Sequence, residues 1–117
     1  MTPKQTLALT RYVKACCPQQ AMDSYTPDAW YDLLGDLPLE DCRAAVVAVA
    51  KRQPFVAPAE IRAEVRAIRD ERLRLAGDPA PPAELLDDPA AYRAWIRRTT
   101  KQIADGQEPQ RAIGSAQ

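Results

Sequence analysis

Apolar residues recur along this chain at the spacing of α-helices. In residues 3–16, Leu9, Tyr12, Val13 and Cys16 stand at positions i, i+3, i+4 and i+7, so a helix would place them on one face. The later apolar stretches also have helical spacing, and none shows the alternation of a half-buried strand. We predict an all-α protein with helices over residues 3–16, 27–34, 38–52, 58–75 and 89–106.

Five prolines stand where these helices should begin. Proline suits the first helical position, because that N–H has no intrahelical partner and the ring presets the helical φ. Thr2 and Gln5 have the spacing of a capping box at the first of these starts. Tyr25 is placed to pack on Trp30 as a hydrophobic staple at the second. The prolines are Pro3, Pro27, Pro38, Pro58 and Pro89.

The inward faces of the first four helices predict one core, and with it a four-helix bundle over residues 1–77. Phe55 and Val56 are apolar residues in the connector before the fourth helix, and we expect both to fill this core from the loop. Gly35 and Gly77 are placed to end helices in the left-handed conformation. The expected core residues are Trp30, Leu33, Leu34, Cys42, Ala45, Val46, Val49, Ala50, Ile61, Val65 and Ile68.

A proline-rich stretch interrupts the helical pattern after the fourth helix. Pro79, Pro81 and Pro82 cannot all lie inside a helix, so residues 78–88 are predicted to form a semi-rigid, acidic linker. The predicted organisation is a bundle over 1–77, this linker, an amphipathic C-terminal helix over 89–106 and a flexible tail over 107–117.

Composition narrows the class of protein. The 117 residues suffice for one domain, or one domain with an appendage. The 16 Lys and Arg balance the 16 Asp and Glu, so no global field draws the chain to nucleic acid or to an anionic membrane. No apolar run approaches the roughly 20 residues of a membrane span, and the first residues lack the apolar core of a signal peptide. We expect a cytoplasmic protein without a membrane partner, with Cys16, Cys17 and Cys42 reduced and buried.

The inventory of catalytic side chains is poor. The chain contains no histidine, so the usual general base near neutral pH is missing and triads of the Ser-His-Asp type are excluded. Its four glycines are isolated, so there is no glycine-rich phosphate loop. Asp28 with Asp32, and Glu60 with Glu64, have a spacing that can hold a divalent metal, but nothing in the sequence completes the shell. We predict a protein that is not an enzyme and that holds neither metal nor cofactor.

The predicted C-terminal helix is amphipathic and basic. A helix of this kind after a proline-rich linker can dock in the groove of a partner protein, lie on a membrane or contact nucleic acid. The alternative is that its aromatic face folds back onto the bundle. The expected partner-binding residues are Tyr92, Trp95 and Ile96 on one side and Arg93, Arg97 and Lys101 on the other.

A second candidate surface is the row of arginines on the helix predicted over 58–75. Arg62, Arg66 and Arg69 lie on one side of that helix. The alternative interpretation is a solvated helix whose acidic residues neutralise the arginines, and the neighbouring Asp70 and Glu71 favour this interpretation.

Two stretches, Tyr25–Leu34 and Phe55–Arg62, resemble one protein family. The first is a short helix that carries a tryptophan, the second is a phenylalanine-proline-isoleucine entry to a charged helix, and an alanine-rich helix lies between them. Together with the first helix, this order resembles the bacteriophage replicative-helicase loader and inhibitor family over residues 7–74. The resemblance assigns structural positions to Trp30, Leu33, Pro58 and Ile61.

The resemblance implies a small helical N-terminal domain followed by a flexible C-terminal region that engages a hexameric replicative helicase. Members of the family deliver the helicase to an origin-bound initiator protein, which requires no active site. The helix predicted over residues 89–106 departs from this pattern, because the C-terminal region of the family is often described as disordered. If the chain is phage-encoded, its compartment is the host-cell cytoplasm.

We therefore expect a non-catalytic adaptor that binds a replicative DNA helicase and assists its loading or inhibition during DNA replication. The first alternative is a small helical DNA-binding or transcription-regulating protein of a phage or mobile element, against which the neutral charge argues. The second is a purely structural interaction module.

Overall fold

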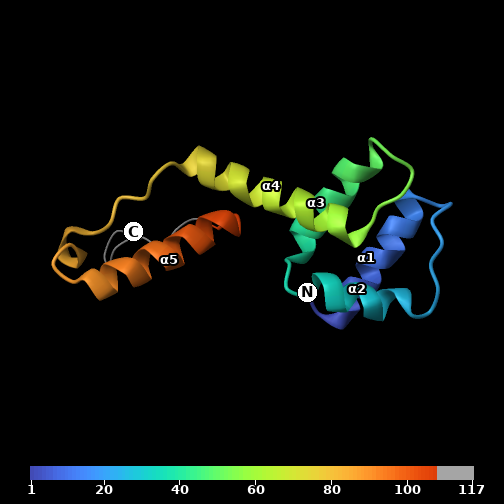
Figure 1. The fold of residues 1–117 in the computed structure, drawn as a ribbon, viewed down its shortest axis with the longest axis horizontal. Helices are drawn as coiled ribbons and strands as arrows, with labels where there is room; N and C mark the ends of the chain where they lie inside the picture. The colour runs from blue at the N-terminus through green and yellow to red at the C-terminus, as the bar shows by residue number, and fades with distance from the viewer. Residues whose placement is uncertain (108–117) are drawn as a thin grey trace, which may run out of the picture. The chain divides into compact units, whose positions relative to one another are not determined.

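The structure is a computed structural model, and it describes residues 1–107. All regular secondary structure in this part of the chain is helical, with no strand, so the predicted all-α fold is confirmed. It divides into two compact units, one over Met1–Ile68 and one that begins at Arg69. We call them unit 1 and unit 2, and Figure 1 labels their helices.

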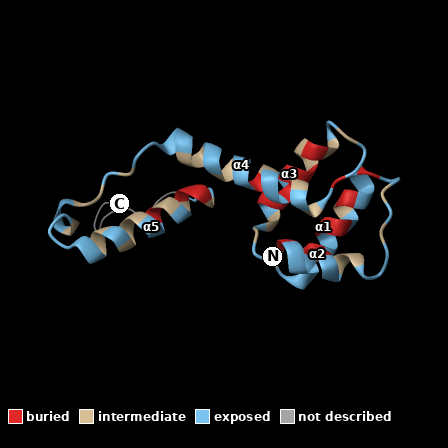
Figure 2. Cartoon of the chain, in the orientation of Figure 1, coloured by how far each residue is buried: buried red, intermediate tan, exposed pale blue. Residues whose placement is uncertain are grey.

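Unit 1 contains three complete helices and the first turns of a fourth. The three are α1 (Pro3–Cys16), α2 (Thr26–Leu34) and α3 (Leu39–Ala50), and the fourth is α4 (Pro58–Ala76). Helix α1 packs against both α2 and α3. Buried residues, red in Figure 2, lie on all four helices. The core consists of Leu9, Val13, Cys17, Trp30, Leu34, Cys42, Ala45, Val46, Val49, Val56, Ile61 and Val65.

The capping interactions determine where the helices begin, and two of the starts differ by one residue from those predicted from the prolines. The predicted capping box is confirmed, because the Gln5 N–H donates to Thr2 Oγ1 at 3.1 Å and the Thr2 N–H donates to Gln5 Oε1 at 2.9 Å. Helix α2 begins one residue before the predicted start, because Asp23 Oδ1 accepts from the Thr26 N–H at 3.1 Å. Helix α3 begins one residue after its proline, since Pro38 has extended backbone and serves as the N-cap.

Four side chains that were expected inside are exposed. Cys16, the last residue of α1, is exposed, so its predicted burial is wrong. Leu33 is 52% exposed, because α2 is short and buries only the narrow stripe of Trp30 and Leu34. Phe55 is 58% exposed while Val56 is buried, as neighbours in an extended connector face opposite sides. Tyr25 is 77% exposed, so the predicted staple onto Trp30 is wrong.

Glycine has different roles at the helix ends. Gly77 and Gly106 have φ of 69° and 81°, which is the left-handed conformation predicted for Gly77. Gly35 has φ of −59°, so its predicted left-handed conformation is wrong. A Cβ at Gly35 would lie 2.6 Å from the carbonyl oxygen of Tyr31 and 3.0 Å from the Tyr31 ring. Glycine is required there by close approach and not by its φ.

A glutamine side chain joins two connectors of unit 1. Gln20 lies between α1 and α2, and Val56 lies between α3 and α4. The Gln20 Nε2 donates to the Val56 carbonyl at 2.8 Å, and the Val56 N–H donates to Gln20 Oε1 at 2.7 Å. Both polar groups of the Val56 backbone are therefore satisfied outside any helix.

Unit 2 is built from the last turns of α4, a short 3₁₀ helix η1 (Ala83–Leu85) and α5 (Pro89–Ala104). Residues 78–82 are not helical, in agreement with the prolines that they contain. The boundary between the compact units falls inside α4, so the segment predicted as a linker, 78–88, lies within unit 2 and includes η1.

The predicted tail, residues 107–117, lies outside the described residues except for its first residue. In the described part of the chain, no helix combines the length and the apolar character that crossing a membrane requires.

Candidate partner-binding surfaces

Local caps determine where α5 begins and ends, and the helical period determines which of its residues share a face. The Asp88 carboxylate accepts from the Ala91 N–H at 3.1 Å, and Pro89 occupies the first turn. The helix ends at Ala104, and Gly106 follows in the left-handed conformation. These signals were all readable from the sequence.

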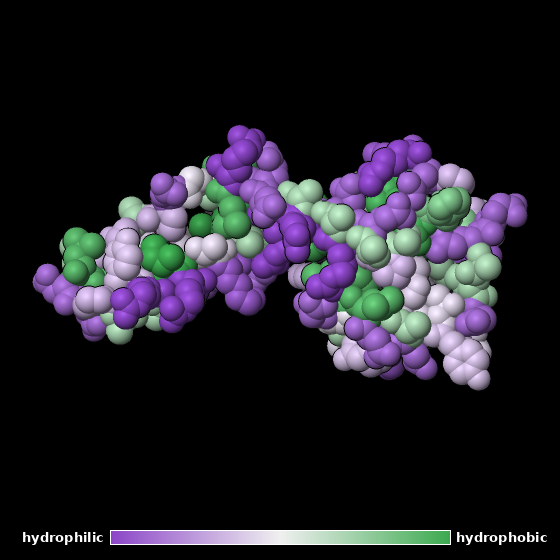
Figure 3. Space-filling view, viewed as in Figure 1, coloured by the Kyte–Doolittle hydropathy of each residue, from purple (hydrophilic) through white to green (hydrophobic). Residues whose placement is uncertain are grey.

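The predicted partner-binding residues of α5 separate into two groups. Tyr92, Trp95 and Ile96 are half-buried, and the apolar side of the helix continues into buried Thr99 and Ile103. The three predicted cations, Arg93, Arg97 and Lys101, are exposed. Unit 2 thus covers part of the aromatic side itself. On the face shown in Figure 3, hydrophobic and hydrophilic side chains lie next to each other over this unit.

The C-terminal end of α5 is bound to the last turns of α4. Arg69 pairs with Asp105 at 2.5 Å, and the Arg72 guanidinium donates to the Ala104 carbonyl at 2.9 Å. Lys101 pairs with the second carboxylate oxygen of Asp105 at 2.7 Å. The hydrogen bonds from Lys101 and Arg69 lower the pKa of Asp105. Helix α5 is therefore an integrated part of unit 2 and not an isolated helix on a tether.

The engagement of Lys101 changes which cations α5 offers to a partner. Arg93 and Arg97 are exposed and form no ion pair with any residue of 1–107. Arg98, which was left out of the predicted site, is exposed and unpaired in the same part of the chain. A search for a single i, i+4 stripe misses this residue because it lies next to the stripe.

The row of arginines predicted on α4 is not a free basic surface. Arg62 donates to both carboxylate oxygens of Asp36, at 2.8 and 2.9 Å, and to the Leu33 carbonyl at 2.8 Å. The Arg62 hydrogen bond lowers the pKa of Asp36 to about 2. Arg69 is paired with Asp105 in unit 2. Of the three, only Arg66 is exposed without an ion pair among the described residues.

A pocket of about 250 Å³ opens on unit 1 between α1 and the start of α2. It was not predicted, although α1 carries a signal for it. Four basic or apolar residues of α1 stand at i, i+3, i+7 and i+10 on one helical face, namely Lys4, Leu7, Arg11 and Lys14. The lining residues are Leu7, Thr10, Arg11, Lys14, Met22, Asp23, Thr26 and Pro27.

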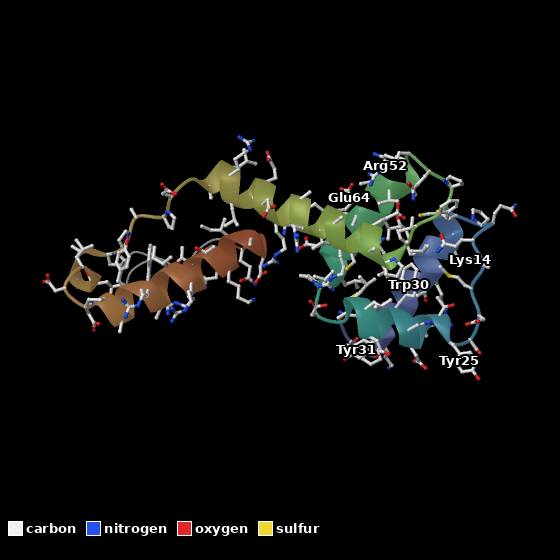
Figure 4. The ribbon with its side chains drawn as sticks, in the orientation of Figure 1. Lys14, Tyr25, Trp30, Tyr31, Arg52 and Glu64 are labelled. Carbon is white, nitrogen blue, oxygen red and sulfur yellow. The ribbon has the colours of Figure 1, made fainter. Side chains whose placement is uncertain are left out.

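The two acidic residues of α4 that were considered for metal binding, Glu60 and Glu64, bind other residues of the chain. Glu60 accepts from the Ala57 N–H at 2.9 Å and from Gln53 Nε2 at 2.6 Å. Glu64 of α4 pairs at 2.8 Å with Arg52, which lies in the turn after α3, and Figure 4 labels both side chains. Within residues 1–107, no three His, Cys, Asp or Glu side chains gather where they could hold a metal ion.

The chain matches no protein-family model, and neither a curated protein nor a solved structure is significantly similar to it.

Proposed function

We propose that this protein is a non-catalytic adaptor that binds a replicative DNA helicase and assists its loading or inhibition during DNA replication. The observation that carries the proposal is α5, where half-buried aromatic residues adjoin exposed arginines that form no ion pair within residues 1–107. The resemblance of residues 7–74 to phage helicase loaders supports the choice of partner. The protein would act in the cytoplasm.

The composition of the α5 surface is typical of protein interfaces. Buried Trp, Tyr and Arg side chains supply most of the binding energy at such interfaces, while rim charges mainly tune the association rate. Trp95 and Tyr92 would therefore anchor the hexameric helicase, with Ile96 beside them. Arg93 and Arg97 would form the charged rim, since Lys101 is engaged by Asp105. An origin-binding initiator protein would be a second partner.

The direct test measures binding of the purified hexameric helicase to the full chain and to three variants. Trp95→Ala should weaken binding by at least about tenfold, because it removes an interface anchor. Arg97→Ala should weaken it less and mainly slow association. Lys51→Ala, which removes an exposed cation of unit 1, is the matched control and should bind as the wild type does. If the helicase fails to bind the wild-type chain, the proposal is wrong.

A second candidate function is nucleic-acid binding through the same helix. It is favoured by one observation, the cluster of exposed Arg93, Arg97 and Arg98 without ion pairs among the described residues. Its signature is an affinity for duplex or single-stranded DNA that falls steeply with salt, because bound phosphates release counterions. Arg97→Ala and Arg98→Ala would then weaken binding more than Trp95→Ala does, which reverses the order expected for the helicase.

A further inference from the structure

The pocket of unit 1 has walls that its own hydrogen bonds hold in place. Lys14 Nζ donates to the Gln20 carbonyl at 2.7 Å and so attaches the end of α1 to the loop that forms the opposite wall. Asp23 accepts from the N–H groups of Tyr25 and Thr26 at 2.8 and 3.1 Å, which holds the turn before α2. Figure 4 labels Lys14 and Tyr25, which mark this end of the unit. The pocket is therefore preformed.

The polar groups inside the pocket are already satisfied. The Thr10 hydroxyl donates to the Leu7 carbonyl at 2.8 Å. The Thr26 hydroxyl accepts from the Asp23 N–H at 3.0 Å, and the Asp23 carboxylate is occupied by its own turn. A ligand that enters the pocket would therefore contact mainly the apolar side chains of its lining, Leu7, Met22 and Pro27.

The charge left at the rim is positive. Arg11 lines the pocket, is exposed and pairs with no carboxylate in residues 1–107. Lys14 has only a neutral carbonyl as its hydrogen-bond acceptor there. The one acidic side chain among the lining residues is Asp23, so with Arg11 and Lys14 the lining keeps a net charge of one positive. Complementarity therefore selects a negatively charged occupant.

The size of the pocket limits what can enter. A volume of about 250 Å³ is below the roughly 300–1,000 Å³ of sites that hold drug-sized ligands. It suits one large side chain that is presented by a peptide backbone. Leu7, at 36% exposed, and Met22, half-buried, supply the apolar surface for such a side chain to cover.

We propose that this pocket docks an acidic segment of a partner protein, with one large apolar side chain in the pocket and flanking carboxylates on Arg11 and Lys14. Only residues 7–27 line the pocket, so the site is independent of α5. The helicase interaction and this one can accordingly fail or succeed separately.

The test uses a synthetic probe, the capped peptide Asp-Glu-Phe-Glu-Asp, titrated into the isotope-labelled full chain while backbone amide shifts are followed. The wild type should bind it with shift changes at the residues that line the pocket. Replacement of the phenylalanine by alanine in the peptide, or Leu7→Ala in the protein, should weaken binding by about tenfold, because each removes one side of the apolar contact.

Charge reversal supplies the second arm. Arg11→Glu should weaken binding by about tenfold or more, whereas Lys51→Glu makes the same charge change outside the pocket and should have no effect. If Arg11→Glu does not fold, Arg11→Gln removes the charge with less change of size. The proposal is overturned if the probe does not bind, if its alanine form binds equally well, or if the two charge reversals behave alike. Self-association of the free chain that Arg11→Glu abolishes would also overturn it, by assigning the pocket to a second copy.

Discussion

Trp30 and Leu33 stand about one helical turn apart on α2, and replacing each by alanine should change the free energy of unfolding by very different amounts. Trp30 is 6% exposed and belongs to the core of unit 1, while Leu33 lies outside it. Trp30→Ala removes the largest core side chain and leaves a cavity that the surrounding helices can only partly fill. The expected loss in the free energy of unfolding is about 3–5 kcal/mol.

That loss is large for a unit of this size. Unit 1 spans Met1–Ile68, and typical stabilities of roughly 0.05–0.15 kcal/mol per residue give it about 3–10 kcal/mol in total. Trp30→Ala should therefore remove a third or more of the stability and can unfold the unit. Leu33→Ala should change the free energy of unfolding by at most about 0.5 kcal/mol, as is usual for exposed positions.

Urea denaturation followed by far-UV circular dichroism measures both variants against the wild type. The midpoint should fall strongly for Trp30→Ala and remain nearly unchanged for Leu33→Ala. Equal shifts for the two variants, or an unchanged midpoint for Trp30→Ala, would show that the core has been assigned to the wrong face of α2.

Three further outcomes are expected. The pKa of Asp36 is about 2 against an ordinary 3.8, so its pair with Arg62 stabilises the fold above pH 4, and this stabilisation is lost as the pH falls toward 2. In Arg62→Ala the pKa of the Asp36 carboxyl, measured by NMR, should return toward 3.8. The free energy of unfolding should fall by less than about 1 kcal/mol, because the pair is exposed. Gly106→Ala should destabilise unit 2 by about 1–2 kcal/mol in thermal melts, since alanine resists a φ of 81°. In the native protein a thiol reagent should label exposed Cys16 rapidly, whereas buried Cys42, whose pKa burial raises to about 11, should react only on unfolding; equal labelling by mass spectrometry would contradict this.

The helices were predictable because their signals are local. The Thr2 capping box, the prolines of the first turns and the glycine after α4 act within a few residues of the backbone that they shape. The buried stripe of α3 also follows from spacing alone, because that helix is apolar over most of its length.

The exposure of some apolar residues was not predictable, because burial depends on which helices pack over a residue. Leu33 has the same spacing as its buried neighbours, but nothing packs over it closely enough to bury it. The ion pairs of Arg62 with Asp36 and of Arg69 with Asp105 join residues far apart in the sequence. The sequence pattern of α4 alone predicted neutralisation by acidic residues of the same helix and did not identify these partners. The sequence marks only the α1 wall of the pocket in unit 1, because the opposite wall comes from the turn before α2.

The Gln20 side chain forms with the Val56 backbone the pair of hydrogen bonds that a neighbouring β-strand would form. The amide of glutamine presents a donor and an acceptor side by side, as a neighbouring strand would, and the Val56 backbone uses both. A glutamate in place of Gln20 could not donate to the Val56 carbonyl. An alanine there would leave both the N–H and the carbonyl of Val56 to hydrogen-bond with water. Hydrogen exchange at the Val56 amide should therefore be slow although the residue belongs to no helix or strand, and its rate reports directly on whether the two connectors stay joined.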